Sequence, residues 1–203
     1  MLVTVPPVVE SGRLRLRDWR IEDFDGYAQL RSSAEDQAYT GGPVSRNQAW
    51  TEFCAKAGEW RVRGTGVFVV ADKGTDRGLG YAGLWYPPFL SEPELCWSLF
   101  PGNTGRGYAT EAAQAARDWA YAALGLKPLM SFVHPDNAPS RAVAERLGAV
   151  IEGSSGKTPF VVRRDGKLVT LMADFGPGPE APKTPKKPAT PKKPKKKKKK
   201  KFF

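Results

Sequence analysis

The feature that most constrains this chain is residues 102–111, which read Gly-Asn-Thr-Gly-Arg-Gly-Tyr-Ala-Thr-Glu. The segment follows a strand-like run over residues 94–100 and leads into a helical run over residues 110–123. The first turn of a helix leaves several backbone N–H groups without partners and carries the positive end of the peptide dipole. A strand, a glycine-rich turn and a helix in this order therefore predict a site for a phosphate group.

The residue types in the turn fit that prediction. Gly105 and Gly107 can take positive φ angles and let the main chain approach a ligand closely, and Arg106 adds a positive charge. The pattern favours a pyrophosphate held without a metal ion. A glycine turn that only starts a helix is the alternative, because a Gly-x-Gly pattern alone is weak evidence.

A second motif supports the phosphate site. After a strand-like run over residues 129–133, residues 137–149 read Asn-Ala-Pro-Ser-Arg-Ala-Val-Ala-Glu-Arg-Leu-Gly-Ala. Together the two motifs resemble the GNAT superfamily of acetyl-CoA-dependent N-acetyltransferases, whose pyrophosphate loop reads Gln/Arg-x-x-Gly-x-Gly/Ala and whose later helix starts with Asn-x-x-Ser. The sequence of residues 105–112, with Trp19 and Asp23 near the first helix, resembles the branch that contains the RimJ/RimL ribosomal-protein acetyltransferases.

This resemblance covers residues 11–175 and has one departure. Gly102 stands where the family has Gln or Arg, so one phosphate contact is missing while the glycine spacing is kept. The resemblance implies acetyl-CoA as cofactor, no metal, and a thioester lying between the central strand and the next strand. It places the cofactor on Trp97, Ser98, Leu99, Phe100, Thr104, Gly105, Arg106, Gly107, Tyr108, Ala109, Thr110, Asn137 and Ser140.

Transfer of an acetyl group to an amine needs a proton acceptor and stabilisation of the departing thiolate. Glu94 is the first candidate for the base, since it begins the central strand at a position where the family often has Glu; an exposed carboxylate on a strand edge is the alternative. Glu92 is a weaker candidate, and His134, the one histidine, is interpreted as a loop or core residue. Ser140 is the candidate on the thiolate side, although Asn137 and Ser140 are equally suited to cap their helix.

The coarse pattern predicts an α/β (mixed α+β) fold. Alternation over residues 13–17, 67–71 and 79–86 indicates strands, the last two paired antiparallel, whereas residues 21–30 and 47–63 have helical spacing. The order that the resemblance implies is β-α-α-β-β-β-α-β-α-β-β. It corresponds to a twisted, mostly antiparallel sheet with a splayed central strand pair and helices on both faces.

Charge divides the chain into a neutral domain and a basic tail. Residues 1–177 hold 20 Lys and Arg against 20 Asp and Glu, whereas residues 178–203 hold 12 Lys against one Glu. We expect an N-terminal extension over residues 1–10, an acetyltransferase domain over 11–175 and a disordered Lys/Pro-rich tail over 176–203. The tail repeats Thr-Pro-Lys-Lys, resembles linker-histone tails and suits nucleic acid, the ribosome or an anionic membrane as partner; a solubilising tail is the alternative.

The remaining composition points to a reducing cytoplasm. No signal-like segment or long apolar run is present, and Cys54 and Cys96 are expected to be unpaired, buried residues. The large aromatic residues, Trp50 among them, are expected mostly in the core, and the 87–89 loop is a candidate wall of the amine pocket. The acceptor is expected to be a protein N-terminus or lysine, or else a small amine. A catalytically weak domain that binds nucleic acid is a further alternative, and monomer and homodimer both stay open.

Overall fold

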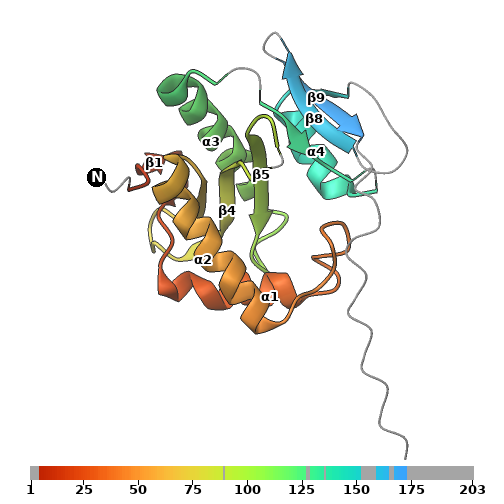
Figure 1. Ribbon diagram of the computed structural model, residues 1–203. Helices are drawn as coiled ribbons and strands as arrows, with labels where there is room; N and C mark the ends of the chain where they lie inside the picture. Colours follow the sequence, from red (N-terminus) through yellow and green to blue (C-terminus); the bar gives the residue numbers. More distant parts are fainter. Residues whose placement is uncertain are drawn as a thin grey trace, which may run out of the picture.

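The computed structural model describes residues 5–88, 90–126, 129–134, 136–151, 159–164 and 167–172, with side chains as far as residue 149. The expectations for the basic tail and for Phe89 lie outside these residues. Two sheets and their helices form the described part (Figure 1). The mixed α/β fold expected from the sequence, with a mostly antiparallel strand arrangement, is confirmed.

The first sheet has five strands in the order of the chain, each antiparallel to the next. They are β1 (Val9–Glu10), β2 (Leu14–Arg17), β3 (Val67–Asp72), β4 (Gly78–Trp85) and β5 (Glu94–Leu99). The second sheet has the order β6-β8-β9-β7, in which β7 runs parallel to β9 and the other pairs are antiparallel. Its strands are β6 (Ser131–Phe132), β7 (Ala149–Ile151), β8 (Pro159–Arg164) and β9 (Lys167–Met172).

Helices cover both faces of the first sheet, as β3 shows. Phe68 and Val70 pack in one cluster with α3 (Tyr108–Leu124), whereas Val67 and Val69 pack in the other with α1 (Phe24–Ser32) and α2 (Arg46–Arg63). The period of two follows from the pleat of a strand, which sends successive side chains to opposite faces. A short 3-10 turn, η1 (Ile21–Asp23), precedes α1, and α4 (Ala138–Arg146) packs near the second sheet (Figure 1).

The ends of α2 follow from its sequence. The Ser45 hydroxyl accepts a hydrogen bond from the Gln48 N–H, and the Gln48 side chain accepts one from the Ser45 N–H, which is a capping box. Gly64 ends the helix with φ of 72°. Local sequence therefore sets both ends of α2, and its buried residues Ala49, Phe53 and Trp60 mark the face that meets the sheet.

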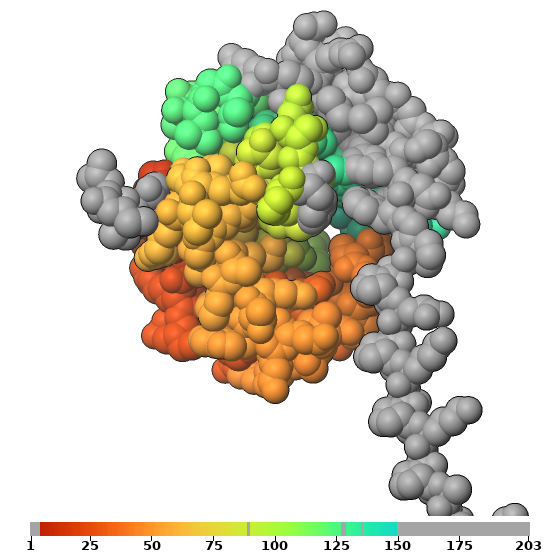
Figure 2. Space-filling view, in the orientation of Figure 1, coloured from red at the N-terminus to blue at the C-terminus, as the bar shows by residue number. Residues whose placement is uncertain are grey.

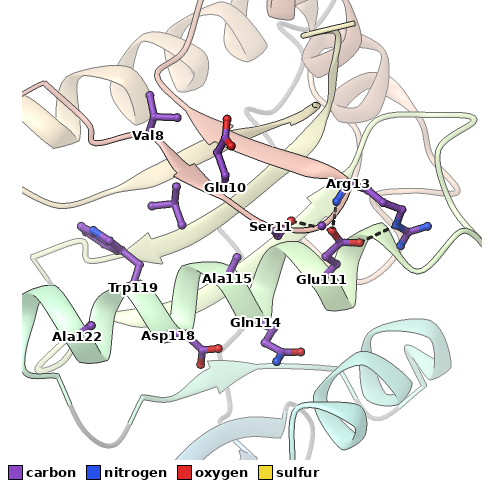
Figure 3. Close-up of a pocket in the computed structure, with 12 residues that line it drawn as sticks. Val8, Glu10, Ser11, Arg13, Glu111, Gln114, Ala115, Asp118, Trp119 and Ala122 are labelled. Carbon is purple, nitrogen blue, oxygen red and sulfur yellow. Dashed lines mark hydrogen bonds and ion pairs between the residues drawn. The ribbon is translucent and has the colours of Figure 1, made fainter. Parts of the chain in front are cut away.

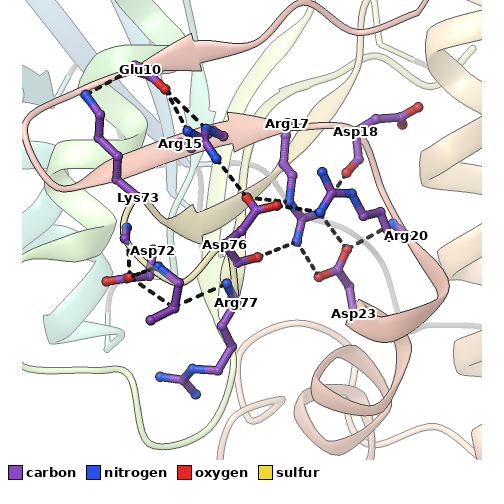
Figure 4. A network of polar contacts seen from close by, with 12 residues as sticks. Glu10, Arg15, Arg17, Asp18, Arg20, Asp23, Asp72, Lys73, Asp76 and Arg77 are labelled. Carbon is purple, nitrogen blue, oxygen red and sulfur yellow. Dashed lines mark hydrogen bonds and ion pairs between the residues drawn. The ribbon is translucent and has the colours of Figure 1, made fainter.

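A buried ion pair holds the start of α1 to β2. The Arg17 guanidinium donates to both carboxylate oxygens of Asp23 at 2.8 and 3.0 Å, and each residue is 4% exposed. Figure 4 shows this pair within a wider polar network in which Asp76 lies between Arg15, Arg17 and Arg20. The arginines lower the pKa of Asp76, mainly through the hydrogen bond from Arg20.

The two sheets touch where β5 begins. Glu94 and Met130 form a parallel bridge, and the Leu95 N–H donates to the Met130 carbonyl at 2.7 Å. The Ser131 hydroxyl donates to the Leu95 carbonyl. Beyond Leu95, none of the described residues of β6 pairs with β5, so the two strands separate towards the end of β5.

Three expectations need correction. Cys54 is exposed, because it lies on the solvent side of α2, and Cys96 is half-buried; both are free thiols. Trp50 is 44% exposed, since it stacks on Phe53 from the outside of the aromatic cluster. Strand β1 was not anticipated: it lies within the expected extension and pairs with β2.

Candidate active site

The loop after β5 has the geometry expected of a phosphate site. Gly105 and Gly107 have φ angles of 77° and 78°, and α3 starts directly after Gly107 without a side-chain cap. None of the backbone N–H groups of residues 104–110 donates a hydrogen bond to another described residue, and residues 104–107 are exposed. These amides are therefore available to an anion at the positive end of the α3 dipole.

Gly102, the departure from the family motif, has a structural reason. Its φ angle is 80°, a region that residues with a Cβ rarely adopt, although a Cβ there would meet nothing within 4 Å. The backbone conformation, not crowding, favours glycine at this position. Asn103 next to it is buried and donates through Nδ2 to the Phe100 carbonyl at 2.9 Å, which ties the turn to the end of β5.

Arg13 links the loop to the N-terminal strands. Its Nε donates to Glu111 Oε2 at 2.8 Å, its Nη1 donates to the Arg106 carbonyl at 3.0 Å, and its guanidinium lies over the Tyr108 ring. Figure 3 shows Glu111 of α3 accepting from Ser11 as well. The hollow of about 820 Å³ beside this link lies between β1 and α3, and no residue of β5, β6 or α4 lines it. It is thus separate from the gap between the sheets.

The splayed end of β5 exposes main-chain groups. Leu95 directs its N–H and carbonyl towards β6. In contrast, the Phe100 N–H donates to the carbonyl of Leu79 in β4. The main-chain N–H and carbonyl groups of successive strand residues point to opposite sides. Those of Trp97 and Leu99 therefore point away from β4, as those of Leu95 do, whereas those of Ser98 point towards β4. The main chain of residues 97–100 was expected to bind the cofactor. Of these four residues, Trp97 and Leu99 therefore offer free main-chain hydrogen-bonding groups.

A cavity of about 1080 Å³ opens at this gap. It is lined by the start of β5, by β6 and the start of α4, and by one side of α2. In Figure 2 the orange, yellow-green and blue-green segments that line it meet around a hollow to the right of centre. The structure brings Glu94, Trp97, Asn137 and Ser140 together here, whereas residues 104–110 lie beyond the far end of β5.

Glu94 is buried at the cavity wall, with 6% of its surface exposed. Its Oε1 accepts a hydrogen bond from the Phe132 N–H at 2.9 Å. Burial raises the pKa of Glu94 to about 8, against smaller opposing effects of that hydrogen bond and of Lys56. The exposed strand-edge alternative is excluded by this burial, and a carboxyl with a pKa near neutrality suits a general base. Glu92 is exposed and does not line the cavity.

Asn137 caps α4, so Ser140 is not needed for capping. Asn137 Oδ1 accepts from the Ser140 N–H at 3.1 Å, while the Ser140 hydroxyl lines the cavity and has no hydrogen-bond partner among the described residues. His134 lines the same cavity; its Nδ1 accepts from the Asp136 N–H and its ring packs on Tyr39.

Sequence patterns missed the contribution of α2 to the cavity. Glu52, Lys56, Glu59 and Arg63 follow one another at intervals of three or four residues and all line it. The same spacing that marks a buried helical stripe was present in these charged residues, but charged stripes usually face solvent. Tyr81 and Tyr86, from β4 and the loop after it, also line the cavity and pack against the two cations.

Comparison with known proteins agrees with this geometry. The family model described as "Acetyltransferase (GNAT) domain" matches residues 13–150. The chain belongs to the GNAT acetyltransferase family. It is accordingly an acetyl-CoA-dependent acetyltransferase, and the loop, the splayed strands and the cavity are features of one enzyme.

Relatives of this GNAT enzyme span most of its described length. "Uncharacterized N-acetyltransferase YnaD" of Bacillus subtilis (strain 168) is 26% identical over 148 residues, which are 71% of this chain and 84% of that protein. The crystal structure of an acetyltransferase from Agrobacterium tumefaciens str. C58 is 34% identical, with a TM-score of 0.69, and covers 84% of this chain and 95% of its own.

Two further solved structures share the fold at 18% identity. One is the apo RimL ribosomal L7/L12 alpha-N-protein acetyltransferase, with a TM-score of 0.64 and coverage of 77% of this chain and 93% of that one. The other is spermidine N-acetyltransferase from Vibrio cholerae in complex with CoA and spermine, with a TM-score of 0.61 and coverage of 75% and 97%. These GNAT proteins differ in acceptor, so the fold alone does not define the amine.

Two features are absent from the described residues of this GNAT enzyme. None of its described helices is long and apolar enough to cross a bilayer. No group of three or more His, Cys, Asp or Glu residues in that part of the chain is arranged to hold a metal ion.

Proposed function

We propose that this enzyme acetylates a primary amine of a protein, an N-terminus or a lysine, as a member of the RimJ/RimL-like branch. The observation that carries the proposal is the open cavity of about 1080 Å³ beside Glu94, at the upper end of the volumes found for small-molecule sites. A peptide end can enter such a space. The resemblance of residues 105–112, with Trp19 and Asp23, to the RimJ/RimL-like sequences supports the same branch.

The residues for cofactor binding follow from the free backbone groups. The amides of Thr104, Gly105, Arg106, Gly107 and Tyr108, with those of Ala109 and Thr110, donate to no described residue and would hold the diphosphate. The N–H and carbonyl groups of Trp97 and Leu99 would pair with the pantetheine arm as an added strand does. Asn137 uses its oxygen as the helix cap and keeps its amide N–H donors for the same arm.

The chemistry then needs three contributions from the protein. Acetyl-CoA supplies the acyl group as a thioester. Glu94, in its ionised form, takes a proton from the ammonium group of the acceptor, directly or through a water molecule, and the neutral amine then attacks the thioester carbonyl. A main-chain N–H of the splayed β5 segment donates to the carbonyl oxygen as negative charge develops there. The Ser140 hydroxyl donates a hydrogen bond to the departing sulfur, which leaves as the thiol or thiolate of CoA.

Mass spectrometry tests the acceptor. The full chain is incubated with acetyl-CoA and with peptides that offer a free N-terminus, an internal lysine or neither, or with a small amine such as spermidine. Each product is examined for an added acetyl group. We expect acetylated peptide only where a free amine is present. In parallel, CoA should raise the melting temperature, because a ligand selective for the folded state stabilises it. Acetylation confined to small amines would contradict the protein acceptor, and a lack of any CoA effect would contradict cofactor binding at the loop.

A further inference from the structure

Two cations in the cavity, Lys56 and Arg63, form no ion pair with a described carboxylate. The Lys56 ammonium lies 4.9 Å from the centre of the Tyr81 ring, and the Arg63 guanidinium lies 4.4 Å from that of Tyr86. Neither makes an ion pair within the described part of the chain, whereas Arg31 on the same cavity is bonded by two nitrogens to the carboxylate of Glu52. An aromatic face compensates a desolvated cation in part, and an anion compensates it more fully.

The carboxylates that face these cations do not balance their charge, even with Glu59 ionised. Glu52 is neutralised by Arg31, and Glu94 has a pKa raised to about 8 by burial, so at neutral pH it is mostly uncharged. Glu59 accepts a hydrogen bond from the Tyr86 N–H, and burial raises its pKa too. Among the described carboxyl, Lys and Arg side chains of the cavity, positive charge therefore prevails near pH 7.

The phosphates of the cofactor do not account for this charge. Lys56 and Arg63 share the cavity with the first four residues of β5, whereas the phosphate loop follows its last residues. From Glu94 to Phe100 the extended chain covers about 20 Å. Arg63 lies at the start of β5, because Tyr86 follows Trp85, the strand partner of Glu94. Lys56 lies further along, over Tyr81, the partner of Ser98, but it projects from α2, whose Phe53 packs on the sheet face opposite to α3. The diphosphate site is the start of α3, so the two cations are on the other face of the sheet, where an acceptor would enter.

We propose that the acceptor carries a carboxylate close to the amine that is acetylated, and that Lys56, with Arg63 further along α2, recognises it. This inference rests on the proposed transfer of an acetyl group to an amine in the same cavity. The carboxylate has two possible sources: the α-carboxylate of a free amino acid, or an acidic side chain next to a peptide N-terminus. A polyamine is disfavoured, because its additional ammonium groups would enter a positively charged cavity.

Lys56 also has a consequence for the amine itself. A nearby positive charge disfavours the protonated form of an amine and so increases the fraction that can attack. The same side chain would thus bind the carboxylate of the acceptor and help to keep its amine neutral.

Matched acceptors test the proposal with the full chain. The kcat/KM at neutral pH is measured for alanine against alaninamide, for the dipeptide amide Ala-Glu against Ala-Gln, and for spermidine. We expect the acidic member of at least one pair to exceed its neutral partner by about tenfold, and the pair that shows the difference identifies the source of the carboxylate. Spermidine should be the poorest acceptor.

Variants connect the preference to Lys56. Lys56→Met keeps a long apolar side chain on Tyr81 and should reduce the preference to less than about twofold, while Lys56→Glu should reverse it. Arg61→Met is the matched control: it removes a positive charge from the same helix at a residue that does not line the cavity, and it should keep the preference. Melting temperatures check that each variant is folded.

The outcomes are distinct for the two proposals. Equal or better use of the neutral or polycationic acceptors, or an unchanged preference in folded Lys56→Glu, overturns the carboxylate proposal while acetyl transfer stands. If no acidic acceptor is acetylated although acetyl-CoA binds, the carboxylate proposal is also overturned. If CoA does not bind and no amine is acetylated, the proposed function itself fails.

Discussion

The side chain of Glu94 accepts a hydrogen bond from the main-chain N–H of Phe132, with 2.9 Å between the oxygen and the nitrogen. This contact bridges the two sheets at the point where β5 and β6 are still joined, next to the place where they separate. The hydrogen bond orients the carboxyl through Oε1, and the other oxygen, Oε2, is left to accept a proton.

Replacing Glu94 with Gln should separate catalysis from binding. Gln keeps an oxygen for the Phe132 N–H but cannot take a proton, so kcat should fall by roughly 10²- to 10⁴-fold while the affinity for acetyl-CoA changes little. Steady-state kinetics and CoA titration measure the two quantities. Glu59→Gln, on the same cavity, is the matched control, and a Glu94→Gln enzyme with normal kcat would exclude Glu94 as the base.

The pH dependence of the wild-type enzyme follows from the same carboxyl. Burial raises the pKa of Glu94 to about 8, and a base acts only in its ionised form. The value of kcat/KM should therefore increase as the pH rises towards about 8 and level off above it, and this dependence should be absent in the residual activity of Glu94→Gln. A rate that already levels off below pH 6 would show that another group accepts the proton.

Gly105 should matter for CoA binding more than for folding. Alanine at a φ of 77° costs about 1 kcal/mol of stability, and relaxation of the backbone would turn the loop amides away from the diphosphate. Gly64→Ala is a matched control, because Gly64 has a φ of 72° and ends α2 away from the loop. We expect the melting temperature to decrease by a similar amount in both variants. Only Gly105→Ala should bind CoA more weakly, as measured by calorimetry. Equal CoA affinity in the two would place the diphosphate elsewhere.

Ser140 and Asn137 should show different defects. Ser140→Ala removes a hydroxyl that has no partner in the described structure, so it should lower kcat by about tenfold with little change in stability. Asn137→Ala removes the cap of α4 and should cost about 1 kcal/mol of stability. Chemical denaturation and kinetics on both variants separate the roles; a stability loss in Ser140→Ala without loss of kcat would make Ser140 structural.

The buried pair of Arg17 and Asp23 should be costly to break on one side. Asp23→Ala leaves the Arg17 guanidinium, 4% exposed, with the more distant Asp76 carboxylate at 3.4 Å, and should reduce the free energy of unfolding by up to about 3 to 5 kcal/mol. The double variant Arg17→Met with Asp23→Leu should recover much of that loss, since it removes both charges. Urea denaturation measures the difference, and additive losses in the double variant would contradict the explanation.

Patterns in the sequence were sufficient for the elements but not for the walls of the cavity. Alternation and capping residues identify β3, β4 and α2, because they depend on neighbours in the chain. The approach of α2 to β6 depends on tertiary packing, so the role of Lys56 and Glu59 in the cavity had no local signal. For the same reason the burial of Glu94, which decides its pKa, could not be anticipated from its position at the start of a strand.

Strand β5 is complete on the side of β4 and incomplete on the other, where Trp97 and Leu99 have no strand beside them among the described residues. Main-chain amides without a hydrogen-bond partner exchange their hydrogens with solvent. A cofactor bound along this edge of β5 would accept hydrogen bonds from them. Slow deuterium uptake at these two amides would then report cofactor occupancy residue by residue, before any acetyl group is transferred. The exchange rates of these two amides would thus distinguish the free enzyme from the enzyme with bound cofactor.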